Sequence, residues 1–188
     1  AVHSEGRNRN AIWDAMERKE IYGTSGPRIL LWFDQVSDQE INPMGSTISL
    51  SNNPKFNVKA VGSFKQKPGC EDFVMEGLPR EKIDTLCGGE CYNPSSERLK
   101  ITRIEVVKIT PQISPDEDVS DLIQDPWLVL PCDGENGCEV EFDDPSFIEN
   151  GRQSIYYVRA IQEATDTING DNLRCKYDSE GNCIEVNP

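Results

Sequence analysis

Short stretches in which apolar and polar residues alternate recur along this chain, and they constrain its fold more than any other feature. In the first of them, Phe56, Val58 and Ala60 occupy one face while Asn57 and Lys59 occupy the other. A period of two residues is typical of a strand with one buried face. Three such stretches are expected to form strands: 56–64, 139–143 and 154–161.

Further strands are expected at 29–33, 47–50, 127–130 and 101–109, the last of which is rich in β-branched residues, and the segments between the strands are polar and rich in turn residues. Strands without alternating helices are typical of an antiparallel β-sandwich. The Tyr-rich strand at 154–161 follows a Gly-containing corner, as in immunoglobulin-like sandwiches. We therefore predict a mainly β, immunoglobulin-like sandwich. No strand is expected after residue 163, so the edge partner of the Tyr-rich strand would be missing or supplied from elsewhere.

An amphipathic helix is expected before the first strand. Ile12, Ala15 and Met16 fall at helical spacing, with Asn8 as the N-cap and Gly23 as the stop. A single helix of this length is unstable alone in water. Its apolar face must therefore pack on the sheet or on another domain.

The chain is expected to be cut from a longer polypeptide. Residues 1–26 would be the last helix and turn of a preceding domain, and residues 27–188 would be the β-sandwich. Two insertions are expected in the sandwich, at about 65–98 and 111–126, and the first holds a helical candidate at 79–86. A disulfide would explain how so long an insertion stays ordered.

The cysteines avoid the apolar strands and lie in polar segments: Cys70, Cys87, Cys91, Cys132, Cys138, Cys175 and Cys183. This placement favours disulfides, and therefore a periplasmic or extracellular location. Cys132 with Cys138, and Cys175 with Cys183, would each close a hairpin loop. Two of the other three would pair, and an odd count is expected if the chain stops before the last partner.

Metal sites are the alternative use of these loops. A zinc site on Cys87 and Cys91 would need further ligands, and the single histidine is His3. Loops 133–137 and 169–172 have the oxygen donors that calcium prefers, but neither matches an EF-hand and both suit tight turns. We expect no metal or cofactor in this chain. With one histidine, no catalytic triad or Cys-His pair is available, so no catalytic residue is assigned.

The charge limits the partners. Acidic side chains number 33 against 19 basic ones, which gives a formal net charge of −14. Such a surface repels phosphate backbones and anionic membranes, so nucleic-acid binding is not expected. No run approaches the roughly 18 apolar residues of a spanning helix, so this segment is not expected to insert into a membrane.

The turn at 22–28, YGTSGPR, holds the candidate binding residues. Two glycines and two hydroxyls before a strand can form a backbone concavity for an anion. The candidate anion-binding residues are Tyr22, Thr24, Ser25 and Arg28. The turn lacks the spacing and the lysine of a P-loop, so a plain helix-to-strand connection is the alternative.

The run at 8–34, NRNAIWDAMERKEIYGTSGPRILLWFD, and SIYYVRAIQE downstream resemble the C-terminal part of the bacterial domain-of-unknown-function 3604 family. Segments such as PMGS, PWLVLPC and NGDNLRC extend the resemblance over essentially the whole chain. The family looks like exported or lipid-anchored relatives of the polymerase-and-histidinol-phosphatase (PHP) metal-dependent phosphoesterases. The resemblance implies an N-terminal PHP-like domain with His and Asp ligands for a divalent metal, none of which can be placed in this chain.

Three functions follow from these patterns. The resemblance implies an accessory β-sandwich that packs on the PHP-type hydrolase domain of the same polypeptide and has no active site of its own. Alternatively, the turn at 22–28 binds the anionic part of that hydrolase's substrate. A third hypothesis is a structural or adhesive module, completed at its open edge by a strand from a neighbour or a second copy.

Overall fold

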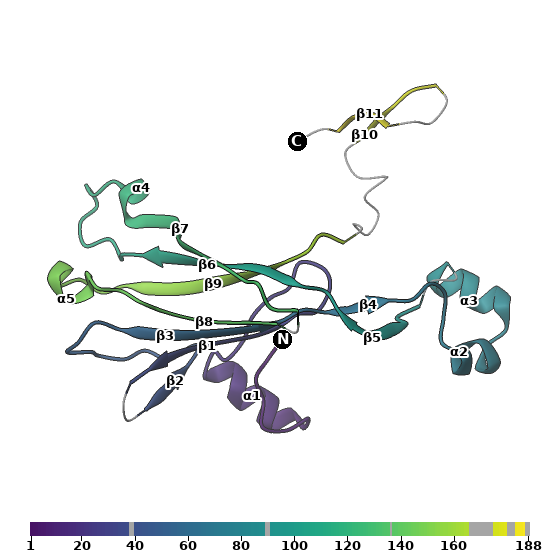
Figure 1. Cartoon of the computed structure of the whole chain (residues 1–188), viewed down its shortest axis with the longest axis horizontal. Coiled ribbons are helices and arrows are strands. Elements are labelled where there is room, and N and C mark those ends of the chain that lie inside the picture. Colours follow the sequence, from purple (N-terminus) through teal and green to yellow (C-terminus); the bar gives the residue numbers. More distant parts are fainter. Residues whose placement is uncertain (38–39, 89–90, 136, 166–174, 180–182, 187–188) are drawn as a thin grey trace.

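The computed structural model describes residues 1–37, 40–88, 91–135, 137–165, 175–179 and 183–186 (Figure 1). The protein is mainly β, and all of its paired strands are antiparallel within those residues. Helix α1 (Arg9–Glu17) precedes the first strand. The predicted class, a mainly β protein with antiparallel sheets behind an N-terminal helix, is therefore confirmed.

The first sheet has the strand order β2-β1-β3-β8. Its strands are β1 (Leu30–Val36), β2 (Ile41–Pro43), β3 (Lys55–Val61) and β8 (Cys138–Asp143). On β3, Phe56, Val58 and Ala60 are buried, as their alternation predicts. This sheet forms the lower layer in Figure 1.

The second sheet has the strand order β7-β6-β9. Its strands are β6 (Ile101–Ile109), β7 (Ile123–Pro131) and β9 (Ile155–Gln162). In the described part of the chain, β9 pairs with β6 alone, so its other edge has no strand beside it. Because β7 already begins at Ile123, the second predicted insertion is shorter than 111–126.

One hydrophobic core joins the two sheets. Phe56 and Phe142 of the first sheet share it with Ile104 and Val106 of the second. The rings of Phe56 and Tyr156 lie 4.8 Å apart, centroid to centroid, across the two sheets. Burial of these apolar side chains is the main force that holds the sheets together.

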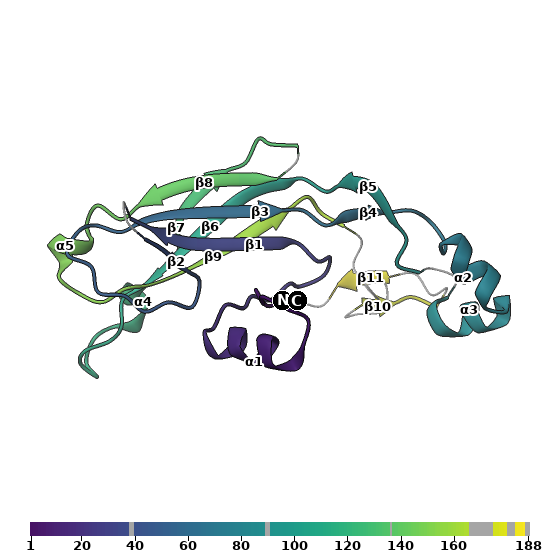
Figure 2. The same ribbon diagram turned by 90° about the horizontal axis from the view of Figure 1, so that it is seen from below.

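The first insertion is a separate small unit. It comprises β4 (Phe64–Gln66), α2 (Asp72–Gly77), α3 (Arg80–Cys87) and β5 (Pro94–Arg98). Strands β4 and β5 pair with each other, and the Cys70–Cys91 disulfide closes the unit at its base. Helices α2 and α3 project beyond both sheets (Figures 1 and 2).

Helix α1 ends earlier than predicted. Its last residue is Glu17, and Lys19 takes the left-handed conformation (φ 61°) that we had expected of Gly23. The N–H of Lys19 bonds to the carbonyl of Met16, and that of Glu20 bonds to the carbonyl of Ala15. These two bonds form a Schellman motif, which satisfies the last carbonyls of the helix without a glycine.

Two expectations about strands were wrong. Residues 47–50 form no strand, whereas residues 41–43, which overlap the stretch 34–42 expected to be a polar loop, pair with β1 as β2. Residues after 163 were expected to contain no strand, but β10 (Cys175–Tyr177) and β11 (Cys183–Val186) pair as a short hairpin. Neither pairs with β9, so the hairpin does not fill the free edge of the second sheet.

Two short helices complete the description, α4 (Val119–Leu122) and α5 (Phe147–Asn150). Among the described residues, no helix has the length and apolar character needed to cross a membrane.

Candidate functional site

The predicted anion-binding turn connects α1 to β1. The hydroxyl of Tyr22 donates to the carbonyl of Ile29 over 3.1 Å, which closes the turn on itself. Thr24, Ser25 and Arg28 are exposed along it. The four candidates therefore lie in one solvent-facing turn, and Tyr22 holds its two ends together.

The N-terminal residues line the base of this turn. The N–H of His3 donates to the carbonyl of Glu20 over 2.9 Å, and its ring Nε2 lies 2.7 Å from the carbonyl oxygen of Leu31. Because a carbonyl only accepts, Nε2 carries the proton in this contact and cannot bind a metal there. The His3 ring also lies 5.6 Å from the rings of Tyr22 and Trp32. His3 thus contributes to packing beside β1.

The cysteines give two disulfides in the described residues, Cys70–Cys91 and Cys132–Cys138. The second bond joins the end of β7 to the start of β8, and so links the two sheets covalently. The side chains of Cys87, Cys175 and Cys183 lie outside the described part, as does the loop 169–172.

Among the described residues, no group of three or more His, Cys, Asp or Glu side chains is placed to hold a metal ion. The loop 133–137, weighed above for calcium, is described except for residue 136. Its Asp133 follows the disulfide at Cys132, and its Glu135 forms an exposed ion pair with Lys100.

A buried charged cluster, absent from the predictions, links the two sheets at one end of the core. Asp144 follows β8 and has no exposed surface, and Lys108 of β6 is 3% exposed. The Asp144 Oδ2 accepts from the Lys108 ammonium and, over 2.6 Å, from the Tyr156 hydroxyl of β9. Its Oδ1 accepts from the N–H and hydroxyl of Ser146, at 3.1 and 2.8 Å. Both carboxylate oxygens are therefore fully engaged.

Burial and hydrogen bonding act in opposite directions on this carboxyl group. Burial raises the pKa of Asp144, but the hydrogen bonds from Lys108, Tyr156 and Ser146 together outweigh it and hold the pKa below its usual range. The pKa of Tyr156 is strongly raised, first by burial and then by its bond to the carboxylate. The cluster is thus a charged pair with a neutral phenol. With every acceptor engaged inside the protein, it is suited to holding strands together rather than to binding a ligand.

The sequence does contain a signal for one half of this cluster. On β6, Ile104, Val106 and Lys108 share one face at a period of two, and the first two enter the core. A lysine on a core face requires a buried carboxylate partner. Which carboxylate it meets is a matter of tertiary structure, because Asp144 is 36 residues away.

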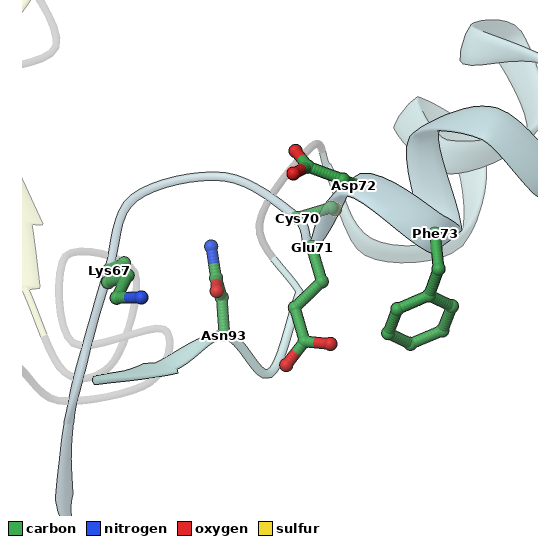
Figure 3. Close-up of a pocket in the computed structure, with 6 residues that line it drawn as sticks. All are labelled: Lys67, Cys70, Glu71, Asp72, Phe73 and Asn93. Atoms are coloured by element: carbon green, nitrogen blue, oxygen red, sulfur yellow. The ribbon is translucent and has the colours of Figure 1, made fainter. Parts of the chain in front are cut away.

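A polar hollow of about 390 Å³ lies where the first insertion leaves β4 (Figure 3). It is lined by Lys67, Cys70, Glu71, Asp72, Phe73 and Asn93. Only Cys70 was singled out in the sequence, and for its disulfide. The other residues come from both ends of the insertion, so only the folded chain brings them together.

A smaller hollow of about 240 Å³ lies beside α1. It is lined by Glu5, Asn8, Asn10, Ala11, Asp14 and Arg18. Asn8 caps the helix by accepting from the N–H of Ala11, and Arg18 pairs with Glu20. Its main polar groups are therefore used in ending and capping the helix.

Together the fold and the cysteine chemistry define a mainly β, disulfide-bonded protein with an N-terminal helix. Residues 1–67 match the model of a family described as "Protein of unknown function (DUF3604)". This match supports membership of the chain in that family, and it covers α1, the turn at 22–28 and strands β1 to β4. No curated protein and no solved structure matched the chain.

Proposed function

We propose that this chain is the accessory β-region of a PHP-type metal-dependent hydrolase, and that α1 packs against the hydrolase domain of the same polypeptide. The catalytic metal would be held by that domain. The family match over residues 1–67 supports the proposal, because these residues include α1 and the turn that follows it. The two disulfides agree with a periplasmic or extracellular location for the parent protein.

The exposed face of α1 is the observation on which this proposal rests. Ala15 is fully buried against the rest of the chain, yet Trp13 is 58% exposed and Met16 is 49% exposed. These two residues are three positions apart, so they share a face directed away from Ala15. Covering a Trp and a Met side chain would contribute about 1.5–3 kcal/mol each. A neighbouring domain would supply that cover.

Substitution of this face tests the proposal in the full-length polypeptide. The variant Trp13→Ser with Met16→Ser should lower the free energy of unfolding by about 3 kcal/mol if both side chains are covered. The control is Ile113→Ser, on an exposed loop, which should change it by less than about 0.5 kcal/mol. Equal, small effects of the two variants would remove the support for packing through α1.

The turn at 22–28 favours a second function, in which the chain helps to bind an anionic substrate. Arg28 is exposed, as are the Thr24 and Ser25 hydroxyls, and the Tyr22–Ile29 hydrogen bond fixes the turn that holds them. Phosphatase assays on the full-length protein separate this function from the first. Arg28→Ala should raise KM for a phosphate ester, and unchanged kinetics would exclude the site.

We infer further that the two sheets form an immunoglobulin-like β-sandwich whose last edge strand is supplied from elsewhere. The shared core supports this interpretation, as does the pairing of β9 with β6 alone among the described residues. In the third hypothesis a second copy or another protein donates the missing strand to β9. Light scattering on the intact protein tests the self-donation form, since a monomer at all concentrations would argue against it.

A further inference from the structure

Helices α2 and α3 form a small projecting unit with little core of its own. Figures 1 and 2 show it at the far end of the β4–β5 ribbon, away from both sheets. Within its described helical residues, Ile83 is the only one that is buried. Four large apolar side chains in and beside the two helices are exposed instead: Phe73, Met75, Leu86 and Tyr92.

This exposure needs an explanation. Phe73 is 69% exposed and Tyr92 is 72% exposed, on a unit that the Cys70–Cys91 disulfide closes at its base. Single exposed apolar residues are common, but several large ones gathered on one unit are typical of a protein contact. Aromatic side chains and Met are the types enriched at such contacts.

The polar hollow beside Phe73 adds a chemical preference. Figure 3 shows the Glu71 carboxylate and the Phe73 ring extending to the same side of the chain. Among the described residues, no ion pair involves Glu71 or Asp72. A cation placed beside Phe73 would meet the Glu71 carboxylate and an aromatic ring, while the Asp72 carboxylate extends to the other side of the chain (Figure 3). The hollow therefore favours a lysine or arginine side chain.

The side of the hollow formed by Lys67 and Asn93 favours a polypeptide over a simple cation. Lys67 lines the hollow, and Asn93, largely buried, lies at its base. An ammonium group would repel a free cation, but it can donate to a backbone carbonyl next to a bound basic side chain. A peptide segment offers both groups at once, and its apolar residues would cover the exposed Phe73 ring.

We propose that this surface, defined by Lys67, Glu71, Phe73 and Asn93 and here called the α2 surface, docks a partner segment with Arg or Lys beside apolar residues. Charge complementarity supports this occupant. The stretch 67–88 has five acidic and three basic side chains, and the whole chain has a net charge of −14. Basic partners are attracted to such a surface and acidic ones are repelled. The proposal is independent of the packing of α1.

A fluorescent 12-residue peptide of alternating arginine and leucine is the probe, titrated by anisotropy against the intact chain. Binding is expected with a Kd on the order of 10–100 µM. The variant Glu71→Gln with Phe73→Ser should weaken binding about tenfold. The control variant, Glu135→Gln with Ile113→Ser, also removes one exposed carboxylate and one exposed apolar side chain, and should bind as the wild type does.

A second peptide, with citrulline in place of arginine, keeps the shape and removes the charge. It should bind at least tenfold more weakly than the arginine peptide. Equal weakening by the two variants would show that net charge alone attracts the peptide, and would overturn the proposal. Absence of wild-type binding would overturn it as well. Circular dichroism of both variants checks that they are folded, which the exposure of the replaced side chains leads us to expect.

Discussion

Replacing Asp144 with alanine should damage the fold far more than the loss of an exposed charge does. The carboxylate is completely buried and accepts from Lys108, Tyr156 and Ser146. Its removal leaves the Lys108 ammonium, whose side chain is 4% exposed, without a counter-charge in the core. Breaking a buried pair in this way costs about 3–5 kcal/mol. A typical domain is stable by about 5–15 kcal/mol, so much of that margin would be lost.

Urea unfolding followed by tryptophan fluorescence measures this loss. Trp127 is a suitable reporter, because its ring centre lies 5.1 Å from the Lys108 Nζ. The matched control is Glu135→Gln, which removes an exposed ion pair with Lys100 and should cost less than about 1 kcal/mol. A cost below about 1 kcal/mol for Asp144→Ala would refute the reasoning.

A double variant distinguishes the cost of leaving Lys108 without a partner from the cost of losing the ion pair itself. Lys108→Met with Asp144→Leu removes both charges and leaves apolar side chains in their place. It should be more stable than Asp144→Ala alone, because no unpaired charge remains in the core. If the double variant is the less stable of the two, packing rather than charge explains the effect.

The same cluster determines how the stability of the fold changes with pH. The folded-state pKa of Asp144 is held below its unfolded value, which is about 3.9. Its contribution to stability is therefore complete above that value and is lost as the pH falls through the folded-state pKa. Urea midpoints should drop below about pH 4, and Asp144→Asn should flatten the drop. An unchanged acid slope in that variant would contradict the assignment.

Two further predictions concern the first insertion and its attachment. A Cβ on Gly62 would lie 1.8 Å from the carbonyl oxygen of Leu99, so Gly62→Ala should cost about 2 kcal/mol or more in urea unfolding. Gly23→Ala, with open space around it, should stay within about 0.5 kcal/mol. Replacing Cys70 and Cys91 with serine should weaken the α2–α3 unit by about 3 kcal/mol. Hydrogen exchange should rise in that unit and not in the shared core; a rise in both would contradict its independence.

The local alternation of apolar residues was sufficient to predict which strand side chains enter the core. Phe56, Val58 and Ala60 are buried, and so is Phe142. A period of two is set within the strand itself, so it can be recognised without knowledge of the partner. The class of fold follows from the same local property.

Strand positions that depend on a partner were not predictable. The polar residues of β5 (Pro94–Arg98) form a strand because β4 lies beside them, whereas the more apolar residues 47–50 have no partner strand. Pairing and burial override intrinsic propensity at such places. The predicted end of α1 was wrong for a related reason. Lys19 adopts a left-handed conformation that glycine would favour, so no glycine marks the end of the helix in the sequence.

For the candidate anion-binding site, the sequence was sufficient to predict that four residues lie in one turn, but not which residues surround that turn. Tyr22 uses its hydroxyl to close that turn, a contact that depends on where Ile29 lies. The residues that line the polar hollow of the α2 surface come from both ends of the insertion, from Lys67 to Asn93, and carry no motif. Only the disulfide between Cys70 and Cys91 indicates that its two ends meet.

The central claim is that α1 packs on a neighbouring domain, and methionine oxidation in the full-length polypeptide tests it most directly. Met16 on α1 and Met75 on α2 are almost equally exposed in this chain, at 49% and 46%. With dilute hydrogen peroxide and peptide mass spectrometry, we predict that Met16 oxidises several times more slowly than Met75, because the proposed hydrolase domain would cover it. Equal rates for the two residues would contradict the account.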